Sequence, residues 1–160
     1  MDAPHIHTRK THTSYVVAGA GLLTLLAFFA MPLASLPVVG SVTGANVAAL
    51  ASKVGSLALL WLVPICAVVI TGTGVWQSLP ATHPPTQRRI ATVMALVAAG
   101  AAVLVYLAVL VGAQNQLAHT SASRLGISAL SLAGAGFWIG LLALAAAGIA
   151  ALLDLVTSKA

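Results

Sequence analysis

The sequence predicts an all-α integral membrane protein in which four transmembrane helices form one bundle. Of its 160 residues, 60% are apolar and only 6% are charged, whereas a soluble domain carries about a quarter charged residues. Four long apolar runs lie along the chain, and each is long enough to cross a hydrocarbon core of about 30 Å as a helix. We therefore expect a single domain at residues 15–154, between a polar tail at 1–14 and a short C-terminal tail at 155–160.

The first expected span covers residues 15–33 and follows a tail that carries Arg9 and Lys10. A basic start before an apolar run is also typical of a signal peptide. This run is long enough to span the membrane, so we expect an uncleaved helix that ends near Pro32, where proline opposes continuation.

The first outer loop, residues 34–54, is unusually apolar for a connection exposed to water. We expect a short helix at 45–53, lying at the membrane interface, with Thr43 as its N-cap. The loop should pack against the mouth of the bundle or against a neighbouring protein.

The other three spans are expected at residues 55–77, 90–113 and 126–153. Pro64 lies inside the second span, and we expect a helix kink there because proline removes a backbone hydrogen bond and clashes with the preceding turn. A proline-rich polar turn that ends in Arg88 and Arg89 separates the second span from the third.

The loop charges predict the orientation. The N-terminal tail, the middle turn and the C-terminal tail carry five of the seven basic residues, namely Arg9, Lys10, Arg88, Arg89 and Lys159. Lys53 and Arg124 lie on the other side. Cytoplasmic loops carry the excess of Lys and Arg, so we expect an N-in, C-in multi-pass protein of a bacterial cytoplasmic membrane.

Aromatic residues agree with this arrangement, because Trp and Tyr gather at membrane interfaces. Tyr15 and Trp76 should lie near the inner interface. The outer interface should contain Phe28, Phe29, Trp61 and Tyr106. Trp138 is the exception, since it falls near the middle of the fourth span.

The spans contain no Asp, Glu, Lys, Arg or His away from their ends. Intramembrane ionisable groups mark proton relays and ion paths, and a haem in such a bundle needs histidines inside the spans. We therefore expect no enzymatic activity, no cofactor of its own and no proton-coupled transport. The basic residues are scattered among short loops, which excludes a nucleic-acid partner. Cys66 has no second cysteine to pair with, and His5, His7 and His12 are interpreted as a solvated or partner-contacting tail rather than a metal site.

Small residues recur at helical spacing and predict close helix packing. The fourth span contains a GxxxG pair, and its surplus of small residues suggests that it also docks against a partner subunit. The expected packing and docking residues are Gly136, Trp138, Gly140, Ala143 and Ala147, together with Ala91, Ala95 and Ala99.

Trp138 leaves three interpretations open. The indole packs within its own bundle, contacts a bound lipid, quinone or carotenoid, or anchors another subunit. Asp154 stands at the inner end of the fourth span, where Arg88 and Arg89 should also emerge. We expect an interfacial salt bridge or electrostatic fit between these charges.

Three functions fit these observations. The first is a non-catalytic accessory subunit of a larger bacterial membrane complex, such as a respiratory or photosynthetic electron-transfer complex, with other membrane subunits and lipids as partners. The second is a homo-oligomeric pore or small-solute transporter, lined by the hydroxyls of Thr24, Thr71, Thr73, Ser128 and Ser131. The third is a tetraspan scaffold. Four helices with cytoplasmic termini are similar to claudin-like proteins, but the first outer loop lacks their tryptophan-and-cysteine pattern, so the chain is not assigned to that family.

Overall fold

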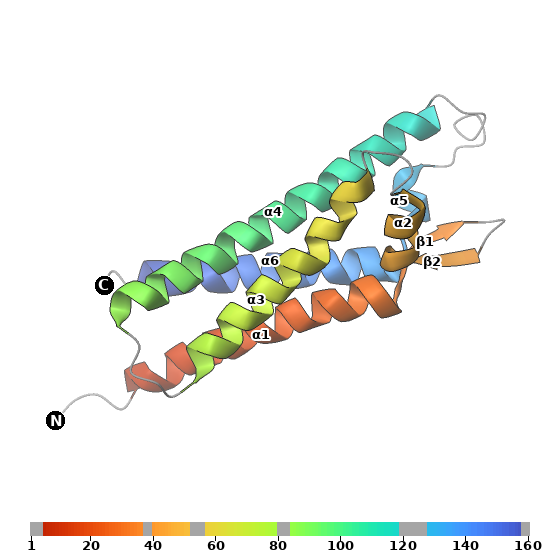
Figure 1. Ribbon diagram of the computed structural model, residues 1–160. Helices are drawn as coiled ribbons and strands as arrows, with labels where there is room; N and C mark the ends of the chain where they lie inside the picture. The colour runs from red at the N-terminus through yellow and green to blue at the C-terminus, as the bar shows by residue number, and fades with distance from the viewer. Residues whose placement is uncertain (1–4, 37–39, 52–56, 80–83, 119–127, 158–160) are drawn as a thin grey trace.

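Four long helices run along one another in a computed structural model that describes residues 5–36, 40–51, 57–79, 84–118 and 128–157 (Figure 1). They are α1 (His5–Ala30), α3 (Leu62–Ser78), α4 (Pro85–Ala118) and α6 (Ala135–Thr157). α1 and α4 each pack against both α3 and α6, which makes a four-sided bundle. Each long helix contains a stretch apolar enough to cross a membrane, which confirms the four predicted spans.

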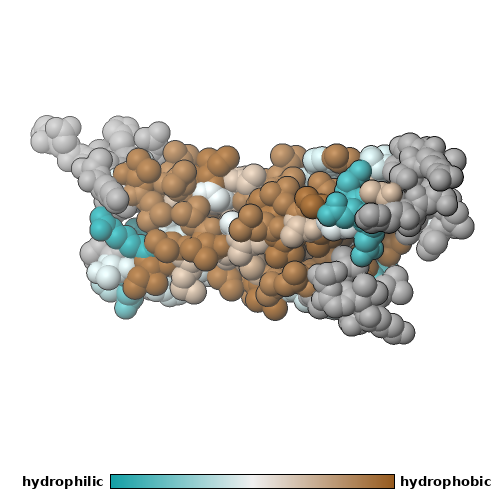
Figure 2. Space-filling model, turned by 90° about the horizontal axis from the view of Figure 1, so that it is seen from above, coloured by the Kyte–Doolittle hydropathy of each residue, from teal (hydrophilic) through white to brown (hydrophobic). Residues whose placement is uncertain are grey.

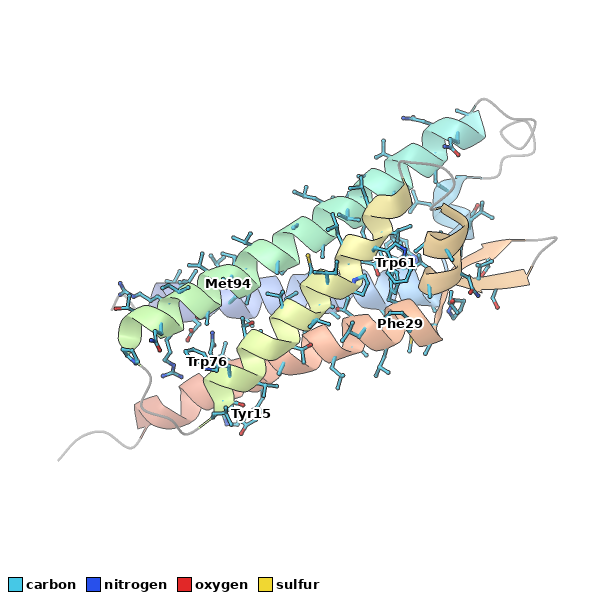
Figure 3. All side chains as sticks on the ribbon, in the orientation of Figure 1. Tyr15, Phe29, Trp61, Trp76 and Met94 are labelled. Atoms are coloured by element: carbon cyan, nitrogen blue, oxygen red, sulfur yellow. The ribbon has the colours of Figure 1, made fainter. Side chains whose placement is uncertain are left out.

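The surface fits a lipid environment. An apolar band covers the middle of the bundle, and hydrophilic residues lie at its two ends (Figure 2). Tyr15 and Trp76 lie toward the end where α1 begins, whereas Phe29 and Trp61 lie toward the opposite end (Figure 3). Tyr15 and Phe29 are about 21 Å apart along α1 at 1.5 Å per residue. The aromatic side chains therefore bracket the apolar band as aromatic belts do.

All four long helices begin earlier or later than the expected spans: α3 begins at Leu62 rather than 55 and α4 at Pro85 rather than 90, and the differences are largest in α1 and α6. α1 already includes residues from His5 onward, so part of the predicted polar tail is helical. α6 begins at Ala135, nine residues after the predicted start at 126. Hydropathy marks the length that lipid covers, not the length of the helix, so polar turns can extend a helix.

The segment before α6 forms a separate turn, α5 (Ala129–Leu132). Ser128 caps it with a reciprocal capping box, in which the Ser128 hydroxyl accepts from the Ser131 N–H at 3.2 Å and the Ser131 hydroxyl accepts from the Ser128 N–H at 3.2 Å. Ala133 then leaves the helical conformation. This capped turn is why α6 starts later than the apolar run.

Pro64 lies in the first turn of α3, directly after the 3₁₀ helix η1 (Leu57–Trp61). The first N–H groups of an α-helix have no partner within it, so proline is tolerated there. The winding changes from 3₁₀ to α between Trp61 and Leu62, just before Pro64, and the kink expected at Pro64 stays a prediction.

The expectation of a purely helical chain needs one correction, because the first outer loop contains a small antiparallel sheet. β1 (Pro32–Leu36) pairs with β2 (Gly40–Thr43), and a register irregularity lies between Pro32 and Ala34. Gly40 has a φ of 82°, which favours glycine. The short helix α2 (Gly44–Ala51) follows, and the Asn46 N–H lies 3.5 Å from the Thr43 hydroxyl, as the predicted cap requires.

β1, β2, α2 and α5 together close one end of the bundle, and we call them the cap (Figure 1). An isolated bridge joins Ala34 of β1 to Ala133, which follows α5. The Gly134 N–H donates to the Leu33 carbonyl at 2.8 Å. The cap therefore ties the connection after α1 to the start of α6. The beginning of α1 and the end of α6 both lie at the opposite end, which we call the open end.

Candidate functional site

A polar network joins three helices at the open end. Thr92 on α4 is 3% exposed, and its hydroxyl lies 3.1 Å from a carboxylate oxygen of Asp154 on α6. The Gln77 side-chain amide of α3 donates to the same hydroxyl at 3.2 Å. The Arg88 carbonyl, 3.0 Å away, is a second acceptor for the single hydroxyl proton of Thr92. Thr92 is thus the centre of a polar contact between α3, α4 and α6.

Asp154 was expected to face Arg88 and Arg89. The structure brings Asp154 to Thr92, and through Thr92 to the backbone of Arg88. A salt bridge with either guanidinium remains a prediction. Sequence reasoning missed Thr92 and Gln77. The spacing of Ala91 and Ala95 marked the buried face of α4, and Thr92 lies beside that row as a polar residue that needs a partner.

The predicted small residues lie inside the bundle. All seven are buried, namely Ala91, Ala95 and Ala99 on α4, and Gly136, Gly140, Ala143 and Ala147 on α6. A Cβ at Gly136 would lie 2.9 Å from the Ala27 carbonyl oxygen of α1. A Cβ at Gly140 would lie 2.7 Å from the Tyr106 hydroxyl of α4. The GxxxG pair therefore provides close approach to both neighbours of α6 within this chain.

Trp138 lies on the opposite face of α6 and is 42% exposed. Its neighbour Phe137 is buried and makes edge-to-face contacts with the rings of Tyr106, at 5.1 Å, and Trp138, at 5.4 Å. The indole is therefore available to lipid or to another protein, as two of its three interpretations require.

Tyr106 carries a buried hydroxyl inside the bundle. The side chain is fully buried, and its oxygen has no hydrogen-bond partner among the residues that the structure describes. An unpaired buried hydroxyl costs about 1–3 kcal/mol. Tyr106 lies level with Gly140 and the last turn of α1, toward the end expected for it, but its ring packs inside the bundle against Phe137 and does not face lipid.

The candidate pore-lining threonines bond to their own helices. The hydroxyls of Thr24, Thr71 and Thr73 donate to the carbonyls of Ala20, Ala67 and Val69, at 2.9, 2.8 and 2.9 Å. Ser128 and Ser131 bond to each other in the cap. The hydroxyl protons of the three threonines are thus used within their own helices.

His12 is exposed on α1, while the side chains of His5 and His7 fall outside the described part of the chain. Among the described residues, no group of three His, Cys, Asp or Glu side chains lies close enough to hold a metal ion. The interpretation of the histidine tail stays a prediction.

A groove runs between α3 and α4 near the open end, with a volume of about 460 Å³. Gly72, Thr73 and Trp76 line it from α3, and Gln87, Ile90, Ala91 and Met94 line it from α4. Trp76 and Met94 mark its two walls in Figure 3. Its lining is almost entirely apolar. We call it the α3–α4 groove.

No protein-family profile matches the chain, and searches of curated proteins and of solved structures find no similar protein.

Proposed function

We propose that this protein is a non-catalytic accessory subunit of a larger membrane complex and that it docks through the exposed face of α6. We define this face by Trp138, Leu142, Ala145, Ala146 and Ile149. Trp138, Leu142 and Ile149 are large exposed side chains. The face carries the proposal because it combines an exposed indole with small residues that allow a partner helix to approach.

The spacing of these residues fits helix packing. Trp138, Leu142, Ala145 and Ile149 follow one another at intervals of four, three and four residues, which places them along one stripe of a helix. Ala145 and Ala146 are exposed between the large side chains. A side chain of a partner helix fits between Leu142 and Ile149 over these alanines.

Two further observations favour a packing role over chemistry. The spans lack Asp, Glu, Lys, Arg and His away from their ends, and many buried positions are alanines and glycines in close contact with neighbouring helices. The threonine hydroxyls bond within their own helices, which makes the pore the less favoured alternative. With N-in, C-in orientation in a bacterial cytoplasmic membrane, the open end faces the cytoplasm.

Co-purification from native membranes in mild detergent tests the proposal. Larger membrane chains, such as those of an electron-transfer complex, should co-purify with the protein. Trp138→Ala combined with Ala145→Leu should release them while leaving the thermal unfolding of the subunit unchanged. Leu104→Ala combined with Ala108→Leu is the matched control, because both residues are exposed on α4. Equal loss of partners in both variants, or purification as a lone ring that conducts ions in liposomes, would overturn the proposal.

A tetraspan scaffold is the second candidate, and the cap favours it. The bridge between Ala34 and Ala133 and the bond from Gly134 to Leu33 tie two connections into one unit outside the apolar band. Such a platform suits contacts with a protein beyond the membrane. Loss of partners after substitutions in the cap, with no effect from the α6 variant, would support this role instead.

A further inference from the structure

We draw no further inference here: the strongest candidate, the apolar α3–α4 groove near the open end, carries none because nothing in the part of the chain that the structure describes shows what covers it.

Discussion

The hydroxyl of Tyr106 on α4 occupies the space that Gly140 on α6 leaves by having no side chain. A Cβ at Gly140 would lie 2.7 Å from this oxygen and 3.4 Å from the ring carbon that carries it. The oxygen is therefore the atom that forbids a larger residue. Because the ring also packs edge-to-face on Phe137, at 5.1 Å, it has little freedom to move away.

This contact predicts that Gly140→Ala lowers the free energy of unfolding by about 1–3 kcal/mol through overpacking. Gly148→Ala on the same helix is the control, because its Cβ would meet the Ala99 methyl at an ordinary 3.8 Å. The control should be neutral or gain up to about 1 kcal/mol in helix propensity. Chemical unfolding in detergent, followed by circular dichroism, measures both.

Tyr106→Phe should rescue the Gly140→Ala variant, because it removes the clashing oxygen and leaves the ring carbon at contact distance. We expect a coupling energy of about 1 kcal/mol or more in the double-mutant cycle. Alone, Tyr106→Phe should be neutral or stabilising, since the hydroxyl has no partner in the described part of the chain. A destabilisation by Tyr106→Phe would instead reveal a bound water or ligand at this oxygen.

The interface between α1 and α3 predicts a second effect of glycine substitution. A Cβ at Gly74 would lie 2.5 Å from the Ala18 backbone nitrogen, and backbone atoms cannot turn aside as a flexible side chain does. Gly74→Ala should therefore destabilise the bundle by about 2 kcal/mol or more. Gly72→Ala, two residues earlier on α3, meets nothing within 4 Å and should be neutral or slightly stabilising. Equal unfolding curves for the two variants would contradict this packing.

Thr92→Val should destabilise the open end by about 1–2 kcal/mol, because it removes the hydroxyl that contacts Gln77, Asp154 and the Arg88 carbonyl. Thr92→Ser keeps the hydroxyl and should recover most of this loss. Thr157→Val is a control at the same end, since that exposed hydroxyl bonds only within α6 in the structure, to the carbonyls of Leu153 and Asp154. Hydrogen exchange near the ends of α3, α4 and α6 reports the local change. A similar loss in Thr92→Ser would show that packing, not hydrogen bonding, makes Thr92 important.

The sequence predicted the four spans because lipid imposes a strong rule. A helix that crosses the apolar core needs about 20 apolar residues, and the chain has four such runs. The rule does not distinguish which face of each helix is buried. The small residues around Gly136 and Gly140 were expected to serve partly in docking, but they contact α1 and α4 within the chain. Trp138 was placed near them in sequence, yet it faces outward.

The sheet and the polar network could not be predicted for a different reason. β1 and β2 have only five and four residues, and one of them begins with proline. In addition, an isolated bridge joins β1 to Ala133, about a hundred residues later in the chain. Thr92, Gln77 and Asp154 likewise come from three helices. Local patterns carry no information about such distant partners.

The cap provides the last prediction, because its closure depends on a single glycine. A Cβ at Gly134 would collide with the Pro32 carbonyl oxygen and would lie 3.1 Å from the Leu33 carbonyl carbon. Gly134→Ala should therefore separate β1 from the start of α6. The bond from the residue 134 N–H to the Leu33 carbonyl should break, and amides of the cap should exchange with solvent at least about tenfold faster, which corresponds to 1.4 kcal/mol of lost local stability.

The bundle itself should survive this change, because the collision involves only the cap and the contacts of Gly140 and Gly74 lie elsewhere on α6 and α3. Exchange of amides in the middle of α1 and α4 should thus remain slow. Gly112→Ala is the control, since a Cβ on that exposed glycine meets nothing within 4 Å. If Gly134→Ala accelerates exchange throughout all four long helices, the cap stabilises the bundle and is not an independent unit. If cap exchange is unchanged, the contact between β1 and the start of α6 does not hold the two connections together, and the scaffold role loses its support.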